Sequence, residues 1–208
     1  MSGRLNLGAP RATARRGRTR NRLLDAAVDV FAERGIDGAT VELICERAGF
    51  SRGAFYSNFA TKEELLFATA EHVQQRSLTR VEEAADRLGS GGPVQLDALV
   101  EHFFTGEDPR WVRIEAEVCR LAQTDPAAGA LMLRMSEHIE SRVLAVIDSV
   151  TAAHRLRLRA APLVVVRTLV ALYRQAAELA WLTGGPFDRT LLTSYLLIAL
   201  ESEAEPDG

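Results

Sequence analysis

The chain has 208 residues, of which 47% are hydrophobic and 25% charged, an ordinary composition for a globular protein with a buried core. Its formal net charge of −3 gives no overall indication of a nucleic-acid partner. No run of about 18 apolar residues predicts a membrane span. No apolar segment follows the arginine-rich N-terminus as a signal peptide would require, so we expect a cytoplasmic protein.

The charge is distributed unevenly along the chain. Residues 1–62 contain 11 Lys and Arg against six Asp and Glu, and seven arginines precede the first acid, Asp25. The remaining residues carry an excess of acid. A basic N-terminal part on an acidic body indicates that only the N-terminal part meets a polyanion.

The first predicted element is a flexible basic arm, residues 1–18, which shows no periodicity. Its arginines either follow a DNA groove or phosphates, or form only a solubilising tail: Arg11, Arg15, Arg16, Arg18 and Arg20. A helix is then expected from Thr19 to Arg34, because apolar residues recur at helical spacing and Gly35 ends the pattern.

Two short helices follow. Thr40 is a suitable N-cap for a helix that runs to Ala48, and Gly49 favours the left-handed turn that ends it. Ser51 is a suitable N-cap for a third helix that reaches about Phe59. Two short helices joined by a glycine-containing turn are typical of a helix-turn-helix.

The rest of the chain is also predicted to be helical, with no strand pattern. The expected helices are 62–88, 94–105, 110–124, 127–151, 161–183 and 188–203, separated by Gly, Pro and Asp. The sequence therefore predicts an all-α fold. Residues 19–66 would form a three-helix DNA-binding domain of the helix-turn-helix type, and residues 67–208 a helical ligand-binding and dimerisation domain.

The segment from Thr40 to Leu66 resembles the TetR (tetracycline-repressor) family. Its most specific part is Phe55-Tyr56-x-x-Phe59-x-x-Lys62-x-x-Leu65, and the resemblance extends over about residues 19–66. It implies a dimeric transcriptional regulator that reads DNA with its third helix and responds to a small molecule bound in the body.

The resemblance also implies which residues contact DNA. The candidates are Thr40, Ser51, Arg52, Gly53, Ala54, Tyr56, Ser57, Asn58 and Lys62. Thr40 and Lys62 would contact phosphates, and Arg52 can donate two hydrogen bonds to guanine. Ser57 departs from the aromatic residue or His that the family often has there, so stacking on the DNA backbone is not expected at this position.

Two C-terminal helices are apolar nearly all round and must be covered on two sides. A second subunit can cover the outer side, and the resemblance implies a four-helix bundle between two chains. The candidate dimer contacts are Leu169, Leu172, Leu192, Tyr195, Leu196 and Leu200. Two-fold symmetry suits a palindromic operator, because paired recognition helices must read half-sites about 34–36 Å apart.

Glu115 lies in the middle of the apolar face of the predicted helix 110–124. A buried carboxylate needs a partner. The partner is either an internal residue, Arg142, His138 or Arg174, or a ligand for which Glu115 is an anchor. The candidate lining of a cavity for a mostly apolar, aromatic-containing molecule is Phe103, Phe104, Trp111, Glu115, Cys119, Met135, His138 and Tyr173.

Other chemistry finds little support in the sequence. Cys45 and Cys119 are expected to be buried reduced thiols, and no spacing of Cys or His indicates a metal. No cofactor motif is present, and no phosphate loop or nucleophile–base pair indicates an enzyme. The expected function is a repressor released from double-stranded DNA by a small molecule. A helical enzyme with a cavity near Glu115 and an architectural DNA-binding protein without a ligand are the alternatives.

Overall fold

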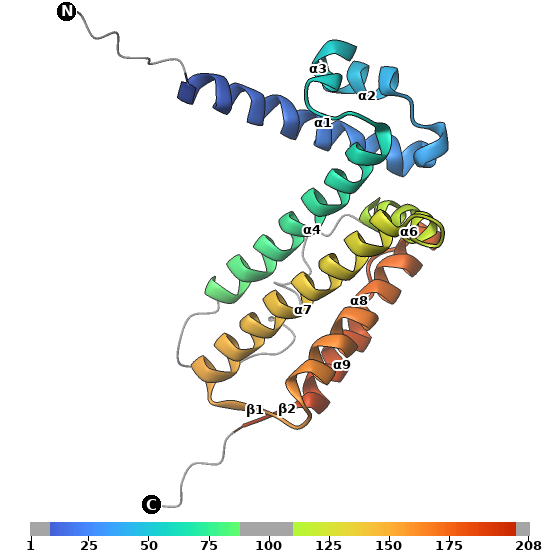
Figure 1. Ribbon diagram of the computed structural model, residues 1–208. Coiled ribbons are helices and arrows are strands. Elements are labelled where there is room, and N and C mark those ends of the chain that lie inside the picture. The colour runs from blue at the N-terminus through green and yellow to red at the C-terminus, as the bar shows by residue number, and fades with distance from the viewer. Residues whose placement is uncertain (1–8, 88–109, 203–208) are drawn as a thin grey trace, which may run out of the picture.

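The computed structural model describes residues 9–87 and 110–202, which form helices and one small sheet (Figure 1). In chain order the elements are α1 (Ala9–Gly38), α2 (Val41–Ala48), α3 (Arg52–Tyr56), α4 (Lys62–Arg87), α6 (Arg110–Ala122), α7 (Pro126–His154), β1 (Leu156–Leu158), α8 (Pro162–Thr183), α9 (Thr190–Ala199) and β2 (Leu200–Ser202). The predicted helical architecture is confirmed for the described ranges, apart from this small sheet. The expected helix 94–105 lies outside them.

Helices α1, α2 and α3 gather at one end of the molecule, and α4 leads from them into the body (Figure 1). In the body, α4 and α7 lie against each other, and α8 packs on α6, α7 and α9. Among the described helices, none is long and apolar enough to cross a membrane.

The prediction of a flexible arm is wrong for residues 9–18, because α1 begins at Ala9 rather than at Thr19. This segment is rich in Ala and Arg, which are good helix formers, and Pro10 stands where a helix tolerates proline, in its first turn. The predicted end of the helix is nearly right, because Gly35 has non-helical backbone angles (φ 67°, ψ 177°) and kinks the chain there.

The predicted caps of the helix-turn-helix are confirmed. The Thr40 side chain accepts a hydrogen bond from the Leu43 N–H, and the Ser51 side chain accepts one from the Ala54 N–H. Gly49 ends α2 in the left-handed conformation (φ 71°, ψ 37°), which costs glycine little. These caps fix where α2 ends and α3 begins, although α3 ends at Tyr56, earlier than expected.

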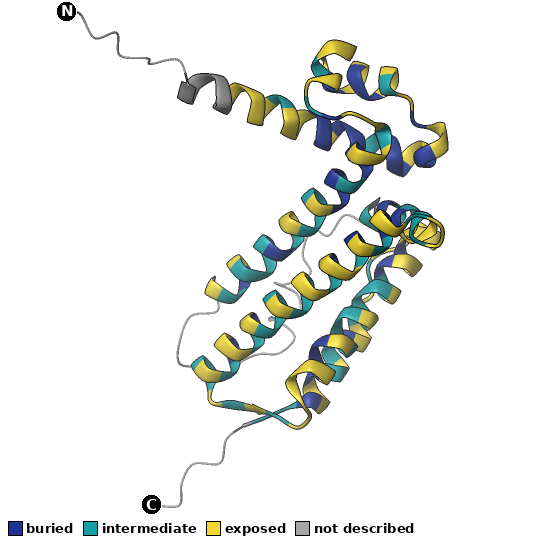
Figure 2. Ribbon diagram, viewed as in Figure 1, coloured by how far each residue is buried: buried dark blue, intermediate teal, exposed yellow. Residues whose placement is uncertain are grey.

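A densely packed core joins the three N-terminal helices to the body. Phe31, Phe55 and Leu66 have no exposed surface, and the same cluster continues to Ile114 and Leu131. Figure 2 shows buried residues gathered where α1 meets α4, and mainly intermediate ones further along α4. Packing therefore continues across the predicted boundary between residues 66 and 67.

A short antiparallel sheet of β1 and β2 corrects the expectation that the chain has no strands. Arg157 is paired with Glu201 in the register, and the Arg157 guanidinium donates to the Glu201 carboxylate at 2.9 Å from Nε. Arg155 ends α7 in the left-handed conformation (φ 51°), which turns the chain into β1. The helix expected over 188–203 consequently ends at Ala199, and β2 continues from it.

Candidate nucleic-acid interface and ligand cavity

Helix α3 presents its first residues outward. Arg52 and Gly53 are exposed and Ala54 is half-buried, while Phe55 and Phe59 are buried in the helical core. The recognition helix of a helix-turn-helix contacts bases with its N-terminal residues. The small side chains at the exposed start of α3 leave room for that approach.

Arg52 is held in place by two neighbours. Its Nη1 atom lies 2.8 Å from Oε1 of Glu42 on α2, and its guanidinium carbon lies 6.0 Å from the centre of the Tyr56 ring. Both partners are more than half exposed. An exposed ion pair contributes little to stability, so Arg52 can exchange Glu42 for a base edge at small cost.

The end of α3 is tied to α1. Ser57 donates its hydroxyl to the Ala54 carbonyl at 2.8 Å, and the Asn58 amide donates to the same oxygen at 2.8 Å. Arg16 on α1 donates to the Ser57 carbonyl at 2.8 Å. Ser57 and Asn58 therefore cap the helix in this state, and an arginine from the expected arm braces it.

Lys62, predicted to contact a phosphate, binds within the protein. Its ammonium donates to the Ile36 carbonyl at 2.5 Å, just beyond the kink of α1 at Gly35. Thr40, by contrast, is exposed at the start of α2. The structure thus places Lys62 at the junction of α1 and α4, and its contact with phosphate stays a prediction.

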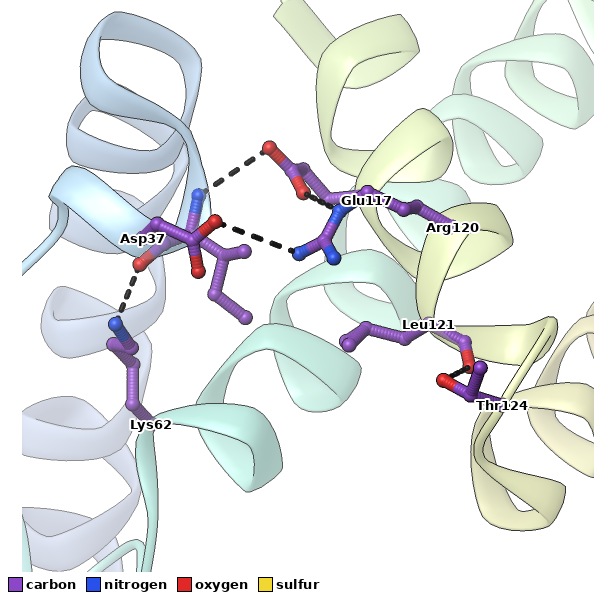
Figure 3. A network of polar contacts seen from close by, with 7 residues as sticks. Asp37, Lys62, Glu117, Arg120, Leu121 and Thr124 are labelled. Atoms are coloured by element: carbon purple, nitrogen blue, oxygen red, sulfur yellow. Dashed lines mark hydrogen bonds and ion pairs between the residues drawn. The ribbon is translucent and has the colours of Figure 1, made fainter.

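Helix α6 closes this junction from the body (Figure 3). Glu117 Oε1 accepts a hydrogen bond from the Ile36 N–H at 3.4 Å, and Arg120 lies 3.9 Å from Asp37 and 3.1 Å from Glu117. Arg113 donates to the Ala32 carbonyl at 2.7 Å. Arg113, Glu117 and Arg120 were not among the residues predicted from the sequence. Their partners come from a segment some 80 positions away, which helical periodicity does not identify.

The opposite face of α6 borders a cavity of about 180 Å³ between α4, α6, α7, α8 and α9. Most of the described residues that line it are apolar. Of the predicted lining residues, Trp111, Glu115, Met135 and Tyr173 border the cavity. Phe103 and Phe104 lie outside the described residues. One helix, α6, therefore contacts both the cavity and the end of α1.

Glu115 has the internal partner that the sequence required. Arg174 on α8 donates from Nη2 to Glu115 Oε1, so of the three proposed partners Arg174 is the one used. Burial raises the pKa of Glu115, and the adjacent Arg174 guanidinium opposes that rise. Arg142, another proposed partner, instead pairs with Glu82.

Trp111 is stacked on Tyr173, with ring centres 5.4 Å apart and planes 7° from parallel. Its indole nitrogen is buried and has no hydrogen-bond partner among the described residues. A buried donor without a partner is costly. Because Trp111 borders the cavity, its indole N–H is a candidate donor for a bound molecule.

Two predicted lining residues are placed elsewhere. Cys119 is exposed and lies 4.0 Å from the Met132 sulfur, which also corrects the expectation that both cysteines are buried. His138 is exposed on α7 and does not border the cavity. Neither position follows from helical periodicity, because the arrangement of the neighbouring helices decides which side chains face the cavity and which stay exposed.

The predicted dimer residues also need correction. Leu192 has no exposed surface and Leu196 is 7% exposed, because both pack on Val146 and Val150 of α7. Leu169, Leu172 and Leu200 pack against the same cluster, and Tyr195 is half-buried. The large apolar residues left exposed on α8 and α9 are Leu163, Val164, Leu179, Trp181, Leu182, Leu191, Leu197 and Ile198. Most of the predicted residues thus lie on the inner face of α8 and α9, and a dimer interface on these two helices stays a prediction.

Within the described ranges, no group of three or more His, Cys, Asp and Glu is placed to hold a metal ion. The remaining candidates for specific chemistry are the exposed start of α3 and the cavity beside α6. The contacts that α1, α4 and α6 make with one another connect these two sites.

Comparison with known proteins places these features in a family. Residues 23–69 match the family described as bacterial regulatory proteins, tetR family. The HTH-type transcriptional regulator UidR of Escherichia coli is 38% identical over 131 residues, 60% of this chain and 64% of UidR. The chain thus spans just under two thirds of UidR.

Two further proteins are similar over more of their length. The HTH-type transcriptional activator FasR of Mycolicibacterium smegmatis is 32% identical over 162 residues, 76% of this chain and 73% of FasR. The structure of SmeT, the repressor of the Stenotrophomonas maltophilia multidrug efflux pump SmeDEF, covers 88% of this chain and 90% of its own, with a TM-score of 0.60 and 22% identity. The SmeT likeness concerns the fold alone. The match to FasR over most of both chains, together with the helix-turn-helix match, shows that the chain belongs to the tetR family of bacterial regulatory proteins.

Proposed function

We propose that the protein is a sequence-specific DNA-binding transcriptional regulator whose DNA affinity is controlled by a small molecule in the body. The observation that carries the proposal is the dual contact of α6. Trp111 and Glu115 of this helix border the cavity, and Arg113 and Glu117 bind the end of α1. A molecule in the cavity thus contacts the helix that holds the DNA-reading end.

Helix α3 is the proposed reading element. Arg52 would exchange its exposed partner Glu42 for guanine in the major groove, and Gly53 and Ala54 would allow close approach. Tyr56, which is 51% exposed, would lean on the DNA backbone beside it. Thr40 and Lys62 would contact phosphates on either side.

The helical extension of α1 adds a second basic element. Arg15, Arg16, Arg18 and Arg20 are exposed on it, and Arg16 is bound to the end of α3. A helix is too wide for the minor groove that an extended arm could enter. We therefore place these arginines along the phosphates that flank the reading site, where they would raise affinity for every sequence.

The exposed apolar face of α8 and α9 is the proposed dimer interface. Leu182 is 63% exposed and Ile198 is 68% exposed, and six other large apolar residues of the same two helices are exposed too. Large apolar residues exposed together on two neighbouring helices indicate an interaction site. A second copy would cover it and set two α3 helices for paired half-sites.

Control by a ligand would follow the contacts of α4 and α6. Leu65 and Leu66 at the start of α4 are buried with the reading helices, while Leu78 and Val81 border the cavity. A ligand that shifts α6 or tilts α4 would change the separation of the two α3 helices. Ligand and DNA would then oppose each other reciprocally.

The direction of regulation depends on where the operator lies relative to the promoter. FasR is named an activator and SmeT a repressor. We place this protein with the repressors, released from a palindromic operator by its ligand. A reporter gene behind the selected operator would be silenced by the protein if it is a repressor, and its expression would rise if it is an activator.

The test of DNA reading is selection of bound duplexes from a random library with the purified full chain. We expect a near-palindromic sequence and two chains per duplex, measured by light scattering of the complex. Recovery of random sequence alone would contradict specific reading.

Two variants on the exposed apolar face of α8 and α9 test the proposed dimer interface. Ile198→Glu should convert the dimer into monomers at micromolar concentration, because it places a charge in a dry interface. Leu191→Ala, on the same face, removes area without adding charge and should weaken the dimer less. Sedimentation measures both, and a wild-type monomer at these concentrations would contradict the interface.

A further inference from the structure

Among the described residues that line the cavity, the charged side chains lie together at one end. Trp111, Glu115 and Arg174 lie at the α6 end, and the remaining lining is dominated by aliphatic side chains such as Val143, Val150 and Leu196. An apolar lining with a few polar groups recognises a molecule of the same pattern. Sugars and other polyhydroxylated molecules would lose most of their hydrogen bonds to water here.

The other polar residues of the lining are already used by the protein. Gln74 donates its amide to the Met135 carbonyl at 2.6 Å, and Thr151 donates its hydroxyl to the Ile147 carbonyl at 2.8 Å. Ser77 accepts from Arg80 at 3.1 Å. What the cavity offers a ligand beyond its polar end is therefore mainly apolar surface.

The shape of the cavity narrows the ligand class further. Its lining includes both Met135 and Thr151 of α7, positions about 24 Å apart at 1.5 Å per helical residue. The lining therefore follows α7 over much of its length, so the cavity is elongated along this helix. A chain-like molecule fits this shape better than a broad fused-ring system.

The charged residues at the polar end favour neutral ligands over charged ones. The charged residues among the described lining are Glu115 and Arg174, which are paired and balance each other. A carboxylate ligand would place two anions on one guanidinium, and a cationic ligand would compete with Arg174 for Glu115. A neutral hydrogen-bond acceptor avoids both penalties and can accept from the unpartnered indole N–H of Trp111.

We infer that the effector is an uncharged, chain-like apolar molecule with one hydrogen-bond acceptor at its end, such as a fatty ester or a long-chain ketone, and that Trp111 donates to this acceptor. The inference rests on the proposed ligand control and names the class of ligand that the cavity takes. Glu115 and Arg174 act together as the group that excludes ions of either sign.

The test compares four probes that share an eight-carbon chain, by calorimetry on the full protein: methyl octanoate, octane, octanoate and octylammonium. Methyl octanoate should bind most tightly, and octane about tenfold less tightly because it makes no hydrogen bond. Both ions should also bind less tightly than the ester. Tightest binding by octanoate, or binding by none of the four, would overturn the inference.

Two variants assign the residues. Trp111→Phe keeps an aromatic ring to stack on Tyr173 but removes the donor, so it should weaken methyl octanoate about tenfold and leave octane unchanged. Glu115→Gln frees Arg174 for an anion, so it should strengthen octanoate about tenfold or more and change the ester little. His138→Ala on the exposed face of α7 is the control and should change no affinity.

If Trp111→Phe lowered the affinities for methyl octanoate and octane equally, Trp111 would not be the hydrogen-bond donor to the ligand. If Glu115→Gln left the affinity for octanoate unchanged, the ion pair of Glu115 and Arg174 would not be what excludes anions. Binding of the selected duplex, measured in parallel without any probe, keeps the two proposals apart. A protein that binds DNA but no probe fails this inference alone, and one that binds methyl octanoate but no duplex fails the proposed function.

Discussion

The two ends of α4 lie in differently packed surroundings. Near its start, Leu66 has no exposed surface and sits in the core shared with Phe31 and Phe55. Three turns later, Leu78 is also buried, at 5% exposure, but it borders the cavity. Dense packing holds the reading helices in one arrangement, whereas empty space lets side chains near the cavity adjust to a ligand. One helix thus joins a rigid part of the molecule to an adaptable one.

The largest expected effect tests this contrast directly with a matched pair on one helix. Leu66→Ala should lower the free energy of unfolding by about 2–5 kcal/mol, because a dense core collapses little around the missing atoms. Leu78→Ala should cost about 1–2 kcal/mol, because its side chain already lacks neighbours on the cavity side. Urea unfolding of both variants measures the difference. Equal losses would mean that packing is uniform along α4.

The next effect concerns the rigid end as a reading surface. Arg52→Ala should weaken binding of the selected duplex by about 1–3 kcal/mol and relax preference at one base pair in each half-site. Arg47→Ala is the control, because Arg47 lies on α2 in an exposed ion pair with Glu33. Fluorescence anisotropy against specific and random duplexes separates the two. If Arg52→Ala weakened both duplexes equally, the base-reading role would be lost.

A smaller effect tests the connection between the two regions. Arg113→Met removes the hydrogen bond from α6 to the Ala32 carbonyl but keeps most of the aliphatic side chain. It should reduce the free-energy coupling between ligand and DNA by about 0.5–2 kcal/mol while leaving ligand affinity nearly unchanged. Arg134→Met, exposed on α7, should leave the coupling as in the wild type. If both variants showed the same coupling, the coupling between ligand and DNA would pass through α4 and not through α6.

The smallest effect is a pH dependence at the cavity. Burial raises the pKa of Glu115 above its ordinary value of 4.5, so the folded state binds a proton there more tightly than the unfolded state does. Stability from this group is present below pH 4.5 and is lost as pH rises through the folded pKa. The stability of the wild type relative to Glu115→Gln should therefore fall as pH rises above 4.5, by under about 1 kcal/mol because Arg174 opposes the shift. A relative stability that rises with pH would show that the ion pair outweighs burial.

The sequence was sufficient for features that depend on local chemistry. Thr40, Gly49 and Ser51 specify caps and a turn within a few residues, so α2 and the start of α3 were predicted correctly. The need of Glu115 for a partner followed from the cost of burying a carboxylate, and Arg174 was among the partners considered.

Features that depend on distant neighbours were not predictable in this way. Leu196 and Ile198 are two residues apart on an apolar helix, and only the position of α7 decides that Leu196 is buried and Ile198 exposed. The sequence did not reveal that Lys62 donates to the Ile36 carbonyl, which lies 26 positions away and just beyond the kink at Gly35. The residues Leu156–Leu158 form a strand because β2 comes alongside them, which a three-residue pattern cannot indicate.

The most direct measurement of the central claim is the affinity of the full-length dimer for its selected duplex, with and without a saturating ligand found by thermal shift. We predict that the ligand binds in the cavity, as shown by loss of binding when Val143→Trp fills it, and that it weakens DNA binding about 5- to 150-fold. The duplex should in turn weaken ligand binding by the same factor. A ligand that binds in the cavity and leaves DNA affinity unchanged would contradict the account.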